Sequence, residues 1–237
     1  AFAAKNRQKT LWLFLGGYLI TLNWGLYIWA VNAGRILETS LGYYINPLVS
    51  MLFGMLFFGE RLRRAQKLAI AVAAAGVCIQ IITIREIPLV SLGLALSFGL
   101  YGAMKKAISI EPAVALVIET LSVAPAALAY LCWLQHTGAA HFPYALTTDL
   151  LLAGTGVMTS VPLLLFAYAA QRIKLTTIGF IQYVSPTMTF LIGTFIYHEP
   201  LSIYRIITFA CIWSALAVYS ADTLIEAGRE RRTQEYI

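Results

Sequence analysis

Charged residues are scarce in this sequence. Asp, Glu, Lys and Arg make up 12% of its 237 residues, whereas a soluble domain contains about 25%. So little charge cannot cover the water-facing surface of a chain of this size, which excludes a soluble globular protein and with it a cytosolic enzyme or a DNA-binding module. Intrinsic disorder is excluded too, because 59% of the residues are hydrophobic and 13% are aromatic, whereas disordered chains are polar and poor in aromatic residues.

Chemically reactive side chains are also few. The chain has three histidines and three cysteines, and Cys78, Cys132 and Cys211 each lie in an apolar run without metal-ligand spacing or a disulfide pattern. No glycine-rich loop is followed by the lysine that a phosphate site needs, which argues against direct use of ATP. The sequence therefore predicts no enzyme, no cofactor and no metal site.

Long apolar runs are what the chain has in abundance, and its mean hydropathy is +0.75. A helix needs about 20 apolar residues to cross a bilayer. Eight runs of that order predict an all-α integral membrane protein with eight visible transmembrane helices, at 11–31, 39–58, 66–84, 87–104, 112–134, 150–171, 175–197 and 201–222.

The positions of the basic residues predict the orientation of these spans. If the spans alternate in direction, all of the 17 Lys and Arg residues except Arg35, Arg85 and Arg205 fall on one side. Cytoplasmic segments carry such an excess of Lys and Arg, so both visible termini are predicted to be cytoplasmic. This bias accounts for the net charge of +6 without nucleic acid as a partner. Lys105 and Lys106 are expected to anchor a helix end to lipid phosphates.

Two stretches of the chain resemble each other. Residues 40–44 (SLGYY) match residues 177–181 (TIGFI), and the register continues with a small insertion. The further matched pairs are Arg35 with Arg172, Asn46 with Ser185, Pro47 with Pro186, Gly54 with Gly193, Glu60 with Glu199, and Leu62 with Leu201. Five predicted spans separate the copies, and because five is odd the copies enter the membrane from opposite sides. Such inverted repeats are typical of secondary transporters.

The repeat predicts the domain organisation. Residues 1–84 form a partial first repeat with its third to fifth helices, residues 85–224 form a five-helix second repeat, and residues 225–237 form a basic cytoplasmic tail. By symmetry two helices are expected upstream, so the parent has ten spans. Because the sequence starts at Ala1 without an initiator Met, we expect that it has been trimmed or is a fragment.

The sequence also resembles a known family. Residues 23–32 (NWGLYIWAVN), 41–48 (LGYYINPL) and 59–62 (GERL) are similar to the RarD group of EamA-type permeases, in the drug/metabolite transporter superfamily, and residues 96–102 and 119–121 fit the same group. The resemblance implies ten helices in two inverted five-helix halves, a bacterial inner-membrane location and carrier-type movement of small metabolites or drugs. RarD proteins are labelled chloramphenicol-sensitivity or chloramphenicol-resistance permeases, which says little about the natural substrate.

Glu119 is the only acidic residue well inside a predicted span. It lies about 10 Å deep by helical rise. A carboxylate there is costly, so it should face the interior of the bundle or a water-filled cavity. Two roles stay open: a proton-linked or substrate-binding carboxylate, and a structural carboxylate bonded to a neighbouring hydroxyl or amide.

Polar residues recur on one face of the two repeat-related helices. Both faces suit the walls of a substrate pathway, although interhelical hydrogen bonding also favours such residues. Asn23, Trp24 and Tyr27 are candidates for a third wall, with an interfacial aromatic belt as the alternative. The residues of the two faces are Tyr43, Asn46 and Ser50 in the first copy and Gln182, Ser185 and Thr189 in the second.

Two further pairs of repeat mates lie on these helices. Pro47 and Pro186 free backbone carbonyls and permit kinks. Glu60 and Glu199 stand at helix ends, where loop capping or a salt bridge with a nearby Arg is expected.

Together these features predict a secondary transporter that moves a small amphipathic metabolite or drug-like molecule by alternating access. Its partners are the small-molecule substrate and the lipid bilayer. Coupling to protons and simple exchange are both open, and the oligomeric state is not predicted. The alternatives are a non-transporting membrane assembly or lipid-scrambling protein, and an intramembrane enzyme acting on lipid, for which no surface cluster of acidic residues or His is seen.

Overall fold

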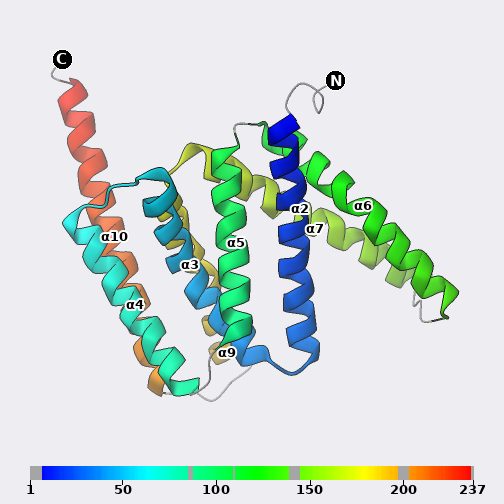
Figure 1. Ribbon diagram of the computed structural model, residues 1–237. Coiled ribbons are helices and arrows are strands. Elements are labelled where there is room, and N and C mark those ends of the chain that lie inside the picture. Colours follow the sequence, from blue (N-terminus) through cyan, green and yellow to red (C-terminus); the bar gives the residue numbers. More distant parts are fainter. Residues whose placement is uncertain (1–6, 85–87, 109, 139–144, 197–202, 236–237) are drawn as a thin grey trace. The chain divides into compact units, whose positions relative to one another are not determined.

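The computed structural model describes residues 7–84, 88–108, 110–138, 145–196 and 203–235. Within these ranges the chain forms helices and no strand (Figure 1). The helices are α2 (Arg7–Asn32), α3 (Ile36–Phe58), α4 (Arg64–Ile84), α5 (Leu89–Ala107), α6 (Pro112–His136), α7 (Leu146–Arg172), α8 (Leu175–Gln182), α9 (Val184–Phe195) and α10 (Ile203–Glu235).

The all-α membrane fold is confirmed. Seven helical segments of the described chain are long and apolar enough to cross a membrane, and α8 and the first part of α9 together supply one of them, Leu175–Ile192. The expected span 87–104 corresponds to α5, which is helical but is not among the seven. Its last turn carries Lys105 and Lys106, so its apolar stretch is short.

The helices gather into two compact units. The first unit comprises Ala1–Gly25 and Tyr101–Ile173, and the second comprises Leu26–Leu100 and Lys174–Ile237. Each unit therefore takes segments from both predicted repeats, and α2 and α5 contribute to both units. The division of the sequence into repeats at 1–84 and 85–224 stays a prediction.

In the first unit, α2 and α6 approach each other closely. A Cβ atom on Gly17 of α2 would lie 2.8 Å from the backbone oxygen of Glu119 in α6, so only glycine fits there. Leu13 packs beside this contact with Met104, Ile108 and other buried residues. Small residues at such contacts let helix backbones pack tightly in a membrane.

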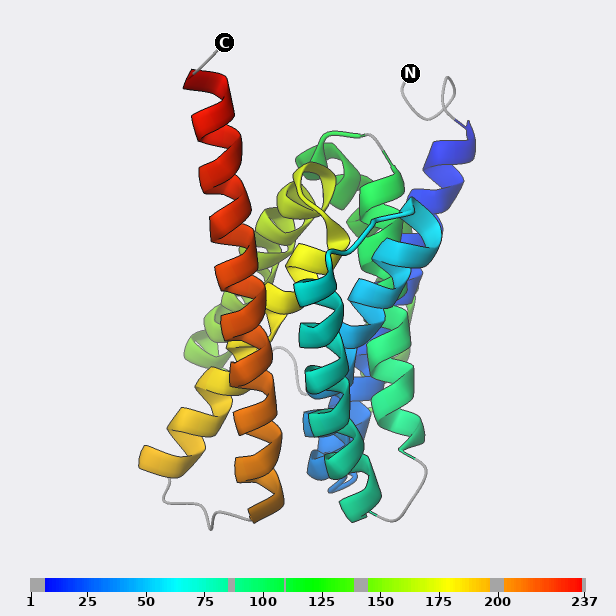
Figure 2. The same ribbon diagram turned by 90° about the vertical axis from the view of Figure 1, so that its left-hand side faces the viewer.

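In the second unit, α4 and α10 lie side by side along most of their length (Figures 1 and 2). A Cβ atom on Gly76 would lie 2.8 Å from Cβ of Cys211, and the Thr208 hydroxyl donates to the Gly76 carbonyl at 3.1 Å. The helix α3 packs in the same way against α8, where a Cβ atom on Gly179 would lie 2.6 Å from the Pro47 carbonyl oxygen.

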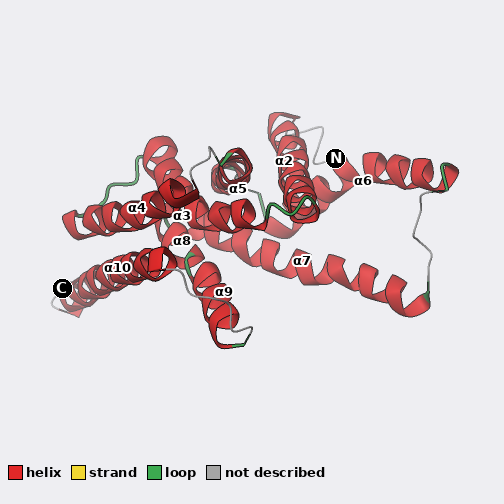
Figure 3. Cartoon of the chain, turned by 90° about the horizontal axis from the view of Figure 1, so that it is seen from below, coloured by secondary structure: helices red, strands yellow, loops and turns green. Residues whose placement is uncertain are grey.

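The two repeat-related prolines have different effects on their helices. The helix α3 continues through Pro47, whereas the second copy breaks at Tyr183 into α8 and α9 (Figure 3). Pro186 has no N–H to donate to the carbonyl of Gln182, and its ring would clash with that carbonyl in a continuous helix. The chain therefore turns one residue after Gln182.

The close approach of α3 and α8 leads to a prediction about stability. We expect Gly179→Ala to lower the free energy of unfolding by about 1–3 kcal/mol, the usual effect of overpacking, because the new methyl group would meet the Pro47 carbonyl. Gly154→Ala in α7 is the matched control, since nothing lies within 4 Å of its Cβ position. Denaturant titration in detergent micelles measures both, and equal stability of the two variants would contradict the prediction.

Candidate functional site

An ion pair is buried in the first unit. Glu119 of α6 is 3% exposed and Lys105 of α5 is 2% exposed. Oε1 of Glu119 lies 2.6 Å from Nζ of Lys105, and Oε2 accepts a hydrogen bond from the Tyr101 hydroxyl at 3.1 Å. Both carboxylate oxygens are therefore engaged by side chains of one helix.

The sequence places these groups by helical spacing and by a small neighbour. Tyr101 and Lys105 are four residues apart on α5, so they point to the same side of that helix. Gly16 of α2 leaves room for the carboxylate, because a Cβ atom there would lie 3.3 Å from Oε1 of Glu119. Tyr101 also stacks on Phe166 of α7, with ring centroids 6.4 Å apart.

The position of Lys105 corrects the expectation that both lysines anchor α5 to lipid phosphates. Lys105 points inward to Glu119 because a buried carboxylate without a partner would be far more costly than a buried pair. The adjacent Lys106 donates to the Ile173 carbonyl at 2.6 Å. The hydrogen bonds to Glu119 fit the structural role that the sequence left open, and they do not exclude the functional one.

A cavity of about 520 Å³ lies beside Glu119, between α2, α6 and α7. Of the predicted wall residues, Glu119 and Trp24 line it, together with hydroxyl side chains that include Thr21, Thr120 and Ser160. The hydroxyls of Thr21 and Ser160 donate to carbonyls of their own helices, so their oxygens face the cavity as acceptors. Asn23 is instead buried and is not part of the lining.

In the second unit, the polar faces of the two repeat copies meet where α3 crosses α8. The Ser50 hydroxyl donates to Oε1 of Gln182 at 3.2 Å. Oδ1 of Asn46 and Nε2 of Gln182 are buried and have no hydrogen-bond partner among the described residues. This crossing thus joins predicted site residues of both copies, Ser50 and Gln182, by a hydrogen bond. It also leaves one buried amide atom of each copy without a partner in the described structure.

The rest of the predicted polar face of the second copy points elsewhere. Because the chain breaks at Tyr183, Ser185 and Thr189 lie on α9 and are exposed, while Gln182 packs against α3. The Thr189 hydroxyl donates to the Ser185 carbonyl of its own turn at 3.1 Å. These three residues therefore do not form one continuous face.

Tyr27, one of the candidates for the third wall, contacts Tyr43 of the first polar face. Tyr27 and Tyr43 pack edge to face with ring centroids 6.0 Å apart. The Tyr43 side chain is 46% exposed, and it is separated along α3 from the buried Ser50. Tyr27 and Trp24 belong to different compact units, so the structure does not place them in one site.

Glu60 was expected to cap a loop or to pair with an arginine, and its partner is the start of α8. Oε1 accepts the backbone N–H of Leu175 at 2.7 Å and Oε2 accepts that of Thr176 at 2.9 Å. A carboxylate satisfies the free N–H groups at a helix N-terminus and interacts favourably with the helix dipole. Its repeat mate Glu199 lies outside the described residues.

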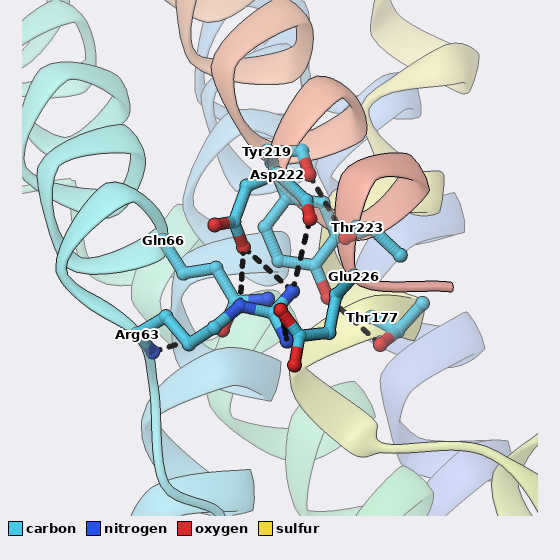
Figure 4. A network of polar contacts seen from close by, with 7 residues as sticks. All are labelled: Arg63, Gln66, Thr177, Tyr219, Asp222, Thr223 and Glu226. Carbon is cyan, nitrogen blue, oxygen red and sulfur yellow. Dashed lines mark hydrogen bonds and ion pairs between the residues drawn. The ribbon is translucent and has the colours of Figure 1, made fainter. Parts of the chain in front are cut away.

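A second polar network joins the loop after α3 to α10, and the sequence did not reveal it (Figure 4). The Arg63 guanidinium donates to Oδ2 of Asp222 at 2.7 Å and lies 4.0 Å from Oε2 of Glu226. The hydrogen bond to Asp222 raises the pKa of the Arg63 guanidinium above its ordinary value. The i, i+4 spacing of Asp222 and Glu226 was the available signal, because it puts both on one face of a helix.

The Glu119–Lys105 pair leads to a second prediction. We expect Glu119→Gln and Lys105→Met each to lower stability by about 3–5 kcal/mol, because each leaves one uncompensated buried charge. The double variant should lose less than the sum of the two single variants. Unfolding in detergent measures all three, and additive losses would show that the two side chains do not interact.

Comparisons with known proteins are consistent with this architecture. The chain matches the EamA-like transporter family over residues 1–82 and 87–221. It is 51% identical over 216 residues to the protein named "Uncharacterized transporter YojE" of Bacillus subtilis, covering 91% of this chain and 72% of that protein. It is 42% identical over 229 residues to the protein RarD of Escherichia coli, covering 96% and 76%.

A more distant relative and a solved structure complete the comparison. The "Chloramphenicol-sensitive protein RarD" of Pseudomonas aeruginosa is 33% identical over 205 residues, covering 86% of this chain and 68% of that protein. A crystal structure with 19% identity superposes with a TM-score of 0.64 over 88% of this chain and 74% of its own, which shows a shared fold. The chain therefore belongs to the EamA-like transporter family as a RarD-type permease, a multi-pass membrane transporter of the drug/metabolite superfamily.

Proposed function

We propose that this permease moves a small amphipathic metabolite or drug-like molecule across the bacterial inner membrane by alternating access, with its visible termini in the cytoplasm. The observation that carries the proposal is the buried ion pair of Glu119 and Lys105 beside a cavity. Ionisable side chains inside membrane spans are rare, and they most often mark substrate or ion pathways.

The lining of the cavity supports the proposed class of substrate. Its volume of about 520 Å³ suits a small organic molecule, since ligand pockets commonly measure about 300–1,000 Å³. The walls are mainly apolar, Trp24 offers an aromatic face, and Thr120 and Ser160 offer hydroxyl groups. Glu119 is the charged side chain of this lining, so a ligand with a hydrogen-bond donor at one end is favoured over an anion.

The partner of Glu119 bears on the coupling ion. Lys105 forms an ion pair with one carboxylate oxygen and Tyr101 donates to the other, so protonation of Glu119 by a coupling proton costs the attraction to the charged Lys105. Proton coupling at Glu119 is therefore easiest in a state of the cycle in which the ion pair is open. Simple exchange of solutes does not require such a state.

Transport in proteoliposomes tests the proposal. With a panel of labelled metabolites and drugs, we expect saturable uptake of at least one compound, and an imposed pH gradient should drive it if protons are coupled. Glu119→Gln should lower kcat/KM for that compound by about tenfold or more, as expected for the loss of a hydrogen-bonded buried charge. The variant should also no longer respond to the pH gradient.

Glu111→Gln is the control, because Glu111 lies on the same helix but at its N-terminal cap. Uptake that is unchanged in Glu119→Gln would remove this residue from the mechanism. Folded protein that gives no selective flux with any compound, but equilibrates labelled lipids between leaflets, would favour the lipid-scrambling alternative.

A further inference from the structure

The two repeat-related helices pack against each other in an antiparallel arrangement. Tyr183 donates its hydroxyl to the Tyr44 carbonyl at 3.4 Å, Gln182 bonds Ser50, and Glu60 holds the start of α8. Residue numbers thus rise along α3 as they fall along α8. Antiparallel packing is what an inverted repeat requires of its matched helices.

The register of the repeat locates the centre of this crossing. The pairs Pro47–Pro186 and Gly54–Gly193 are 139 residues apart, and this offset also relates Ser50 to Thr189. Extended back to the two tyrosines, it pairs Tyr43 with Gln182 and Tyr44 with Tyr183, in place of the mates that the match of 40–44 with 177–181 gives them. Tyr44 and Tyr183 touch each other. A residue that touches its own repeat mate lies on the pseudo-two-fold axis, so this contact divides the crossing into two halves with equivalent sequences.

One half of the crossing is closed. It runs from the Tyr44–Tyr183 contact through the Ser50–Gln182 hydrogen bond to Glu60. In this half the Glu60 carboxylate packs closely against Gly54 of α3. A Cβ atom on Gly54 would lie 2.6 Å from Oε2 of Glu60.

Three connections fix the end of the closed half. The backbone N–H of Glu60 bonds the Gly54 carbonyl, which aims its side chain from the turn that ends α3 toward α8. Thr177 of α8 bonds the Tyr219 hydroxyl of α10 at 2.8 Å. Arg63 ties the following loop to α10 through Asp222 (Figure 4).

The other half of the crossing lacks the equivalent contact. The mate of the Ser50–Gln182 pair is Thr189 with Tyr43, and no hydrogen bond joins these two side chains in the described structure. Tyr43 packs on Tyr27 and is half exposed, and Thr189 bonds its own helix. Among the described residues, the two halves that correspond in the repeat register therefore differ in this contact.

We propose that Glu60 is a positioning residue of the transport cycle, which clamps α8 against α3 in a state closed at this end. Transport exchanges the Ser50–Gln182 contact for the Tyr43–Thr189 contact at the opposite end, with the Tyr44–Tyr183 contact as the pivot. This inference rests on the proposed alternating access, and it adds which contacts alternate and which residue holds one of the two states.

The clamp and the pivot have the physical properties that this exchange needs. Glu60 binds backbone N–H groups at the end of a span, where water can replace it more readily than in the middle of the membrane. The break at Tyr183 ends the continuous hydrogen-bond ladder between α8 and α9. The chain can therefore bend at the pivot, so that α8 leaves α3 as Thr189 of α9 approaches Tyr43.

Paired cysteines test the exchange. Cys78, Cys132 and Cys211 are first replaced by serine, and the full protein is reconstituted with either Ser50→Cys/Gln182→Cys or Tyr43→Cys/Thr189→Cys. A short bifunctional thiol reagent should crosslink the first pair at rest. It should crosslink the second pair when transported solute is supplied. Crosslinking the first pair should abolish flux, and reduction of a cleavable crosslink should restore it.

Glu60→Gln, made in each paired background, tests the clamp. We expect it to lower crosslinking of the first pair and to raise that of the second, shifting their ratio by about tenfold, the usual effect of losing a charge-assisted hydrogen bond. Gly54→Ala should shift the ratio in the same direction because its methyl group would displace the carboxylate. Gly228→Ala, with nothing within 4 Å of its Cβ position, should leave the ratio unchanged.

The outcomes separate this inference from the proposed function. Flux that persists after the first pair is crosslinked, or a second pair that never crosslinks during flux, would overturn the exchange and leave the transporter proposal intact. Equal loss of both crosslinks in Glu60→Gln, together with a lower unfolding midpoint, would make Glu60 merely structural. A ratio that shifts in Glu60→Gln while no solute of the panel is transported would contradict the proposed function instead.

Discussion

The hydrocarbon of a membrane offers no hydrogen-bond partner, and this constraint governs every polar group in the chain. It accounts for the helices that make up the described residues, because a helix satisfies its own backbone. The same constraint makes Glu119 depend on Lys105 and Tyr101. It also makes Oδ1 of Asn46 and Nε2 of Gln182 unusual, because neither has a hydrogen-bond partner among the described residues. Polar side chains in the spans thus mark either a bond between helices or a place prepared for a ligand.

The two matched stretches of the sequence show how one sequence pattern supports two structures. Pro47 and Pro186 are mates, but only the second interrupts its helix. Both prolines are buried, and their neighbours differ: the Pro47 carbonyl lies against Gly179 of α8, whereas Ser185 beside Pro186 is exposed. Equivalent sequences in unequal surroundings are the physical basis of a carrier with two alternative states.

The sequence predicted the spans well because apolar length is a local property. It also singled out Glu119, since a lone acid in an apolar run stands out. The sequence did not identify Lys105 as the partner of Glu119. Lys105 lies next to Lys106 at a helix end, where the excess of Lys and Arg in cytoplasmic segments suggested contacts with lipid phosphates. The break at Tyr183 separated Gln182 from Ser185, which helical periodicity alone could not foresee. Partner choice depends on tertiary packing, and a single sequence does not encode it in any local pattern.

The buried pair between α5 and α6 also bears on how the chain enters the membrane during synthesis. The helix α5 ends in two lysines and is not among the seven candidate spans of the described chain. Glu119 arrives only with the next helix, and the ion pair with Lys105 then removes one of those charges from contact with lipid. The two helices are therefore best inserted together as a hairpin. The charge of Lys105 is then neutralised by Glu119 as soon as α6 has been synthesised.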